Sequence, residues 1–157
     1  VESFFLVQDA HSKNSVEFGS FPPHCLRGSD EAKTIDEIST LPFYKKCITV
    51  TKNSLSPAYL TEFDMLLNKK KQIDTFIVVG NCTDLCVYSL AMHLRLSANA
   101  ANVTRRIIIP ENCVATYDLS VEAALKAGAA PHDASLLHKL FLYHMKLNGI
   151  EIVKNIC

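Results

Sequence analysis

Cys86 is the side chain in this sequence that is best placed to act as a nucleophile. An apolar run over residues 76–79 stops at Gly80, and a short polar turn and an amphipathic helical pattern follow it. This order predicts that Cys86 lies in the first turn of a helix just beyond the carboxyl end of a buried strand, where open α/β sheets bind ligands. Because a helix amino terminus favours negative charge, the reactive thiolate is favoured there. A buried structural cysteine is the alternative, and the CxxxC spacing from Cys82 disfavours a redox pair.

A second group of candidate residues lies in and just before a long irregular stretch. Asp9 and His11 are two residues apart, so in an extended chain they point to the same side, and His24 lies further along. A carboxylate with two imidazoles suits a divalent transition metal such as Zn, Fe or Mn. Three protein ligands leave an open position for water or substrate, as in catalytic metal sites. The alternative is that Asp9 caps a turn and that the histidines are ordinary loop residues.

Lys52 is the third candidate, because it ends a strand-like run that begins at Cys47. In a parallel sheet, this carboxyl end lies at the same edge as Asp9 and Cys86. The Lys52 ammonium group could therefore stabilise the Cys86 thiolate. The alternative is a solvent-facing lysine at a strand end.

Strand-like runs alternate with helical patterns along the whole chain. The strands are expected over residues 3–8, 47–51, 75–80, 105–110 and 150–154. The helices are expected over residues 29–39, 58–70, 84–98, 119–127 and 133–148. This alternation predicts an α/β fold, a three-layer α/β/α arrangement with a mostly parallel, Rossmann-like sheet. The remaining histidines lie in or near these helices and are interpreted as surface or packing residues: His93, His132, His138 and His144.

The composition is that of a globular domain. A length of 157 residues suits one domain, and 48% of the residues are hydrophobic. The formal net charge is +0 and no dense basic patch occurs, so we expect no nucleic-acid partner. No apolar stretch is long enough to span a bilayer, so we expect no membrane partner. The six cysteines are expected to be reduced thiols in a cytoplasmic protein.

Five segments together resemble a known family, the isochorismatase-like cysteine hydrolases, and particularly the plant-type nicotinamidases. The resemblance covers essentially the whole chain, and it is the combination of segments that is specific. The segments that carry it are Asp9-Ala10-His11, residues 21–28, Lys52, residues 80–87 and residues 114–118.

This resemblance implies an activity and a role for each residue. The chain would hydrolyse nicotinamide to nicotinic acid and ammonia through a thioester on Cys86, with Lys52 as the lysine of the catalytic triad. The peptide bond between Cys82 and Thr83 would be cis and would help to shape an oxyanion hole. The ligands of the divalent metal would be Asp9, His11 and His24.

The resemblance also implies that residues 1–157 are an N-terminally incomplete hydrolase domain. The family's first strand, first helix and triad aspartate would precede Val1, and their absence would interrupt the sheet. The missing segment could be cleaved but still associated, or supplied by a separate chain, and a homo-oligomer is expected. Two alternatives stay open: a related cysteine amidase for another small amide or carbamoyl substrate, and an inactive relative that acts as a binding subunit.

Overall fold

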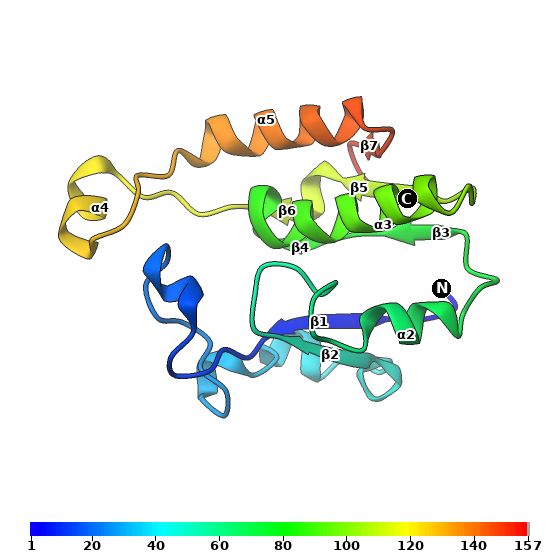
Figure 1. The fold of residues 1–157 in the computed structure, drawn as a ribbon, viewed down its shortest axis with the longest axis horizontal. Coiled ribbons are helices and arrows are strands. Elements are labelled where there is room, and N and C mark those ends of the chain that lie inside the picture. Colours follow the sequence, from blue (N-terminus) through cyan, green and yellow to red (C-terminus); the bar gives the residue numbers. More distant parts are fainter. Residues whose placement is uncertain (157) are drawn as a thin grey trace. The chain divides into compact units, whose positions relative to one another are not determined.

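The chain has an α/β fold in which parallel strands alternate with helices (Figure 1). The structure is a computed structural model and describes residues 1–156. The chain forms two compact units, the first over Val1–Lys70 and the second beginning at Lys71. No helix within the described residues is long and apolar enough to cross a membrane. Cys25, Cys47 and Cys113 carry free thiols, as expected, whereas Cys157 lies outside the described residues.

The first unit is built on two parallel strands, β1 (Phe5–Asp9) and β2 (Ile48–Lys52). Their register pairs Asp9 with Lys52, so the carboxyl ends of the two strands coincide. Helix α2 (Phe63–Asn68) packs on β1 through Phe63, whose ring meets Phe5 edge to face with centroids 5.8 Å apart. This small core holds the two strand ends together.

Short helical segments connect β1 to β2. They are the 3₁₀ turns η1 (Val16–Gly19), η2 (Asp30–Ala32) and η3 (Tyr44–Lys46) and the helix α1 (Asp36–Ser39). The single helix expected over residues 29–39 is therefore wrong. Lys33 and Ile35 are extended between η2 and α1. Thr34 instead accepts a hydrogen bond from Gln8 at 2.6 Å and contacts the Tyr44 hydroxyl at 3.2 Å, and these long-range contacts replace local helical ones.

The helix expected over residues 58–70 is also shorter than the pattern predicts. Leu60 has a left-handed backbone with φ 55°, which interrupts any helix through residues 58–62. The Thr61 hydroxyl then accepts from the Phe63 N–H at 3.1 Å, so α2 begins at Phe63. Side-chain capping of this kind satisfies an N–H that has no intrahelical partner.

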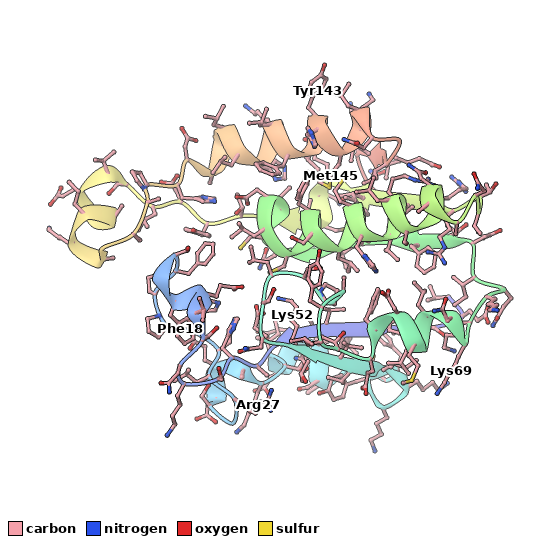
Figure 2. The ribbon with its side chains drawn as sticks, viewed as in Figure 1. Phe18, Arg27, Lys52, Lys69, Tyr143 and Met145 are labelled. Atoms are coloured by element: carbon pink, nitrogen blue, oxygen red, sulfur yellow. The ribbon has the colours of Figure 1, made fainter. Side chains whose placement is uncertain are left out.

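The second unit contains a three-stranded parallel sheet in the order β3-β5-β7. These strands are β3 (Thr75–Ile77), β5 (Arg106–Pro110) and β7 (Glu151–Val153). Helices α3 (Tyr88–Ala100) and α5 (Ala134–Leu147) contact this sheet and each other. Buried apolar side chains of α3, β5 and α5, with Ile150 just before β7, form the core, as Figure 2 illustrates for Met145. They include Ala91, Leu94, Ala98, Ile107, Ile109, Met145 and Ile150.

The strand expected over residues 75–80 is divided in the structure. The Val78 N–H still donates to Ile108 at 2.9 Å, but the chain then leaves β5. Gly80 has φ 121°, a conformation open mainly to glycine, and it begins β4 (Gly80–Asn81), which pairs with β6 (Val114–Ala115). The parallel strands of the described residues thus form separate sheets instead of one.

Two features between β6 and α5 complete the second unit. Helix α4 (Val121–Ala127) is capped by Ser120, whose side chain accepts a hydrogen bond from the Ala123 N–H. Its C-cap is Gly128, with φ 66°. Leu119 and His132, on either side of α4, form an isolated antiparallel bridge. The left-handed backbone at Gly128 is typical of a glycine at a helix end.

Glu151 and Arg106 join the ends of β7 and β5 in an exposed, two-pronged ion pair. Arg106 Nε and Nη2 donate to the two Glu151 oxygens at 2.9 and 2.7 Å. The Arg106 hydrogen bonds lower the pKa of the Glu151 carboxyl. A lowered folded-state pKa stabilises the fold above the unfolded-state value, and this contribution is lost as pH falls through the folded-state pKa.

We therefore expect Glu151→Gln to lower the free energy of unfolding slightly at pH 7 and to have no effect at pH 2, where both states are protonated. Because the pair is exposed, the effect should also shrink at high salt. Urea denaturation at both pH values measures it. Glu37→Gln is the control, since Glu37 makes no ion pair within the described residues. A difference that persists at pH 2 would contradict the electrostatic explanation.

Candidate active site and metal centre

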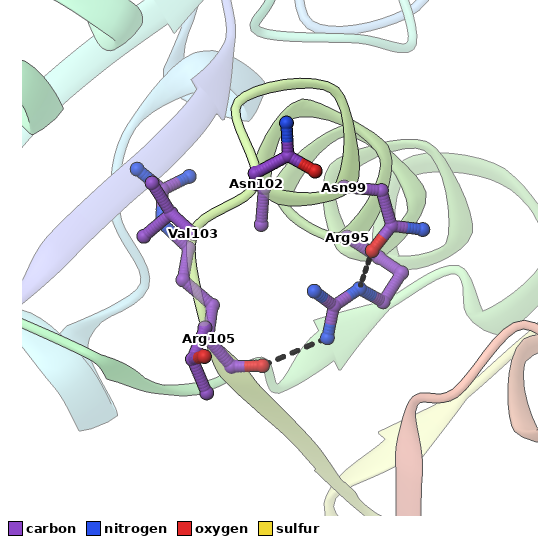
Figure 3. Close-up of a pocket in the computed structure, with 7 residues that line it drawn as sticks. Arg95, Asn99, Asn102, Val103 and Arg105 are labelled. Atoms are coloured by element: carbon purple, nitrogen blue, oxygen red, sulfur yellow. Dashed lines mark hydrogen bonds between the residues drawn. The ribbon is translucent and has the colours of Figure 1, made fainter.

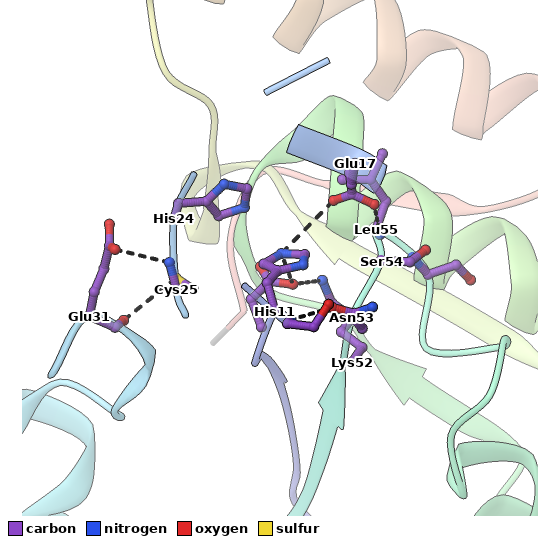
Figure 4. A network of polar contacts seen from close by, with 12 residues as sticks. His11, Glu17, His24, Cys25, Glu31, Lys52, Asn53, Ser54 and Leu55 are labelled. Atoms are coloured by element: carbon purple, nitrogen blue, oxygen red, sulfur yellow. Dashed lines mark hydrogen bonds and ion pairs between the residues drawn. The ribbon is translucent and has the colours of Figure 1, made fainter. Parts of the chain in front are cut away.

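Asp9, His11 and His24 come together in the first unit, as the sequence predicts. One ligand atom from each lies within 4.8 Å of the others. Asp9 ends β1, and His11 follows it as a buried residue with 1% of its surface exposed. The backbone of His11 bonds to Cys25 and Arg27 at 3.0 and 2.9 Å. These backbone bonds bring the segment with His24 to the end of β1 (Figure 4).

The ring nitrogens of the two histidines fit a metal ligand set. His24 Nδ1 lies 2.8 Å from the Pro22 carbonyl, which can only accept, so Nδ1 carries the proton and Nε2 keeps its lone pair. Both ring nitrogens of His11 are buried without a hydrogen bond within the described residues. Buried polar atoms normally have a partner, and a cation held between these groups would provide one. A carboxylate and two imidazoles suit a divalent transition metal.

Glu17 belongs to the same cluster, although the sequence analysis missed it. Its Oε1 lies 3.9 Å from His11 Nε2 and is buried without a hydrogen bond within the described part of the chain. Its other oxygen accepts from the Leu55 N–H at 3.1 Å, which fixes the carboxylate. No motif marks Glu17, and the signal in the sequence is only an acidic residue between the two histidines.

Cys25 is adjacent to this cluster but is not among the three residues whose ligand atoms come together. Burial, followed by the carboxylates of Asp9 and Glu31, raises the pKa of the Cys25 thiol. Its Sγ lies 3.5 Å from the Glu31 carbonyl, consistent with a weak hydrogen bond.

Lys52 is buried at the end of β2 with 3% of its surface exposed, so a solvent-facing lysine is excluded. Its ammonium group forms an ion pair with Asp9 Oδ1, and the same oxygen lies 3.5 Å from His11 Nε2. Asp9 thus links Lys52 to the imidazole cluster. A buried ammonium group without such a carboxylate would be costly.

We expect Lys52→Met to lower the free energy of unfolding by about 1–3 kcal/mol, because it leaves the Asp9 carboxylate without its cation. Lys52→Arg keeps the charge and is the matched control for stability. Urea denaturation curves measure the effect. A free energy of unfolding in Lys52→Met equal to that of the wild type would contradict a stabilising role of this ion pair.

Cys86 lies in the second unit, on the turn that the sequence predicts. Strand β4 ends at Asn81, and a π-helical turn, η4 (Thr83–Val87), leads directly into α3. The Cys82 carbonyl accepts from the Leu85 and Val87 N–H groups, both at 3.1 Å. Cys86 is half-buried within this first turn. The predicted position of Cys86 beyond a strand and at a helix start is confirmed.

The cis peptide bond is one position earlier than the sequence analysis places it. It joins Asn81 to Cys82, whereas the expected position between Cys82 and Thr83 is wrong. The Cys82 carbonyl already accepts the first bonds of the helical turn, so the bond to Thr83 belongs to the helix start. The chain changes direction before Cys82, next to Gly80.

His132 and Asp84 form a second feature that the sequence analysis missed. His132 Nε2 lies 2.7 Å from Asp84 Oδ2, and both residues are buried. His138 similarly contacts the Thr83 hydroxyl at 2.9 Å. The interpretation of His132 as a packing residue is thus incomplete, because its ring makes a polar contact with Asp84, which lies two residues before Cys86.

An open hollow of about 440 Å³ lies at the other end of α3 (Figure 3). Arg95 there donates to the Asn99 side chain at 3.0 Å and to the Arg105 carbonyl at 2.8 Å. None of the predicted site residues lines it.

Known proteins share both the sequence pattern and the fold. Nicotinamidase 1 of Arabidopsis thaliana is 28% identical over 159 residues, which is 94% of this chain and 64% of that protein. The chain thus spans less than two thirds of that relative's length. The structure of N-carbamoylsarcosine amidase from Thermoplasma acidophilum matches with a TM-score of 0.63 and 26% identity, over 94% of this chain and 69% of that one. Nicotinamidase from Bacillus subtilis shares the fold, with a TM-score of 0.67 and 23% identity over 96% and 74% of the two chains.

The family assignment rests on most of the chain. The model of the isochorismatase domain matches residues 3–136, which include β1, β2, the turn with Cys86 and the start of α5. It therefore covers both groups of predicted site residues. This chain belongs to the isochorismatase family.

Proposed function

We propose that this chain hydrolyses nicotinamide to nicotinic acid and ammonia through a thioester on Cys86. The observation that carries the choice of substrate is the cluster of Asp9, His11 and His24, with two buried His11 nitrogens that lack hydrogen bonds within the described residues. Relatives that act on isochorismate or carbamoyl substrates need not have this trio. The similarity to a plant nicotinamidase supports the same choice.

The covalent step is assigned to Cys86. Its thiolate attacks the carboxamide carbon, the carbon–nitrogen bond breaks, and ammonia leaves with the proton that the thiol gave up. Water then hydrolyses the thioester and releases the carboxylic acid. Two easier steps thus replace one difficult step. Backbone N–H groups of the turn that starts at Cys82 would stabilise the oxyanion. Stabilisation of this kind typically lowers the activation barrier by about 3 kcal/mol.

The residues of the first unit would bind and orient the substrate. Asp9, His11 and His24 would hold a divalent metal, and Glu17 would add a second negative charge close to it. The bound metal would supply a Lewis-acidic position that accepts the ring nitrogen of the substrate. Lys52 would hold Asp9 in place through their ion pair. The candidate metals in this proposal are Zn, Fe and Mn.

Ammonia release from nicotinamide tests the proposal, with N-carbamoylsarcosine as the comparison substrate. The assay uses this chain with each substrate in turn. Release of ammonia from nicotinamide supports the proposal. Release from the carbamoyl substrate alone would show that the substrate is a carbamoyl compound instead of nicotinamide. No release from either substrate would contradict an amidase and favour a binding subunit.

A further inference from the structure

The Asp84 cluster consists of the side chains of Asp84, Thr116 and His132 in the second unit. The Thr116 hydroxyl donates to Asp84 Oδ1 at 2.5 Å, and His132 Nε2 lies 2.7 Å from Asp84 Oδ2. Asp84 and His132 are only 6% and 8% exposed. Both carboxylate oxygens of Asp84 are therefore engaged in a site that largely excludes water.

The orientation of His132 is fixed by several contacts of its own. Its Nδ1 donates to the Tyr117 carbonyl at 2.8 Å, and its ring stacks on the Tyr117 ring with centroids 4.0 Å apart. Its backbone exchanges two hydrogen bonds with Leu119, at 2.8 and 2.9 Å. Both ring nitrogens are thus used, and the imidazole joins the segment after β6 to Asp84.

His132 is also the ion-pair partner of Asp84 within the described residues. A buried carboxylate that loses its cationic or hydrogen-bonding partner carries a large desolvation cost. The contact therefore constrains where the Asp84 side chain, and hence its backbone, can lie.

Asp84 is two residues before Cys86 in the same turn, η4. Side chains two residues apart on a helix do not face each other, so Asp84 would act on Cys86 through the backbone of the turn. Thr83, the next residue back, is fully buried and is held by His138 of α5. Two successive side chains of the turn that presents the thiol, Thr83 and Asp84, are therefore held by histidines that lie far along the chain.

We propose that His132 is a positioning residue for Cys86, which holds Asp84 and thereby fixes the turn that presents the thiol. This inference rests on the proposed role of Cys86 as the nucleophile. His132 itself would not touch the substrate. Its effect would be on the reactivity of the thiol and on kcat, with little change in KM.

Two amide variants separate the contacts of His132. The nitrogen of Gln in His132→Gln can take the place of Nε2 and keep the contact with Asp84. The nitrogen of Asn in His132→Asn can take the place of Nδ1 and keep only the contact with the Tyr117 carbonyl. Each variant loses one buried hydrogen bond, and His132→Asn should lose more stability because it leaves the Asp84 carboxylate oxygen without its partner. Lys146→Gln, at an exposed position of α5, is the control.

The main readout is the rate of Cys86 alkylation by iodoacetamide, followed by mass spectrometry of its peptide in the full chain, with exposed Cys113 as the internal standard. We expect His132→Asn to slow Cys86 alkylation on the order of tenfold, the scale that the loss of one buried hydrogen bond sets, and His132→Gln to stay near wild type. The same order is expected in kcat, at constant KM.

Two other results would overturn the inference. Equal alkylation rates in folded His132→Asn and His132→Gln would show that the Asp84 contact does not position the thiol. A wild-type Cys86 that reacts no faster than Cys113 would overturn the proposed nucleophile itself, and the inference with it. The two failures are thus distinguishable, because the second is already visible in the wild-type protein.

Discussion

Cys86→Ala should abolish hydrolysis of the amide while leaving ligand binding largely intact. The thioester route needs the Cys86 sulfur as the nucleophile. The expected loss in kcat is roughly 10⁴-fold or more, the scale seen when a covalent nucleophile is removed. Ammonia release measures turnover, and calorimetry with nicotinamide measures binding.

The fold should tolerate this change, because Cys86 is half-buried and the substitution removes only one sulfur atom. Cys113→Ala is the matched control, since Cys113 is exposed and lies outside the turn. It should keep wild-type activity. Substantial residual hydrolysis by Cys86→Ala would exclude Cys86 as the nucleophile, and equal losses in both variants would point to a general effect of removing thiols.

His24→Ala should lose the metal and the activity together. His24 is a better test than His11 because it is only half-buried, so its removal perturbs the core less. Elemental analysis of wild-type protein should find one divalent metal per chain, and His24→Ala should hold none at the same concentration. Because a ligand that binds only the folded state stabilises it, saturating metal at about 100 times its Kd should add roughly 2.7 kcal/mol to the wild type and nothing to the variant.

Glu17→Gln extends this test to the residue that the structure adds to the cluster. Removing the second carboxylate near His11 should weaken metal affinity by about tenfold without abolishing binding. His144→Ala, on exposed α5, should bind metal like wild type. An unchanged metal content in His24→Ala would overturn the assignment of the cluster. So would wild-type protein that binds none of the three candidate metals, Zn, Fe and Mn.

Local sequence patterns predicted the fold class and the places of the main candidates. Cys86 follows an apolar run and starts a helical pattern, and both signals act within about ten residues. Asp9 and Lys52 each end a strand, and parallel strand ends meet at one edge, so their proximity in the first unit follows from chain order. These inferences hold because they depend on backbone periodicity, which neighbouring residues determine.

The pattern failed where distant contacts decide the local structure. The helix expected over residues 29–39 is broken where Thr34 bonds to Gln8 and Tyr44. The position of the cis bond is likewise a matter of where the chain turns between β4 and the helix, and the residue types around Cys82 do not specify it. At Thr34, contacts outside the local window outweigh intrinsic propensity.

The polar partners of the site are also beyond the reach of sequence patterns. His132 lies 48 residues from Asp84, and no spacing rule connects a histidine before α5 with an aspartate in the turn of Cys86. Glu17 likewise meets His11 only because the loop after β1 folds back. The sequence by itself determined which residues have the chemistry of a thiol nucleophile and a metal centre. The tertiary structure decided which buried charges support them, because a desolvated side chain must find its partner wherever the folded chain provides one.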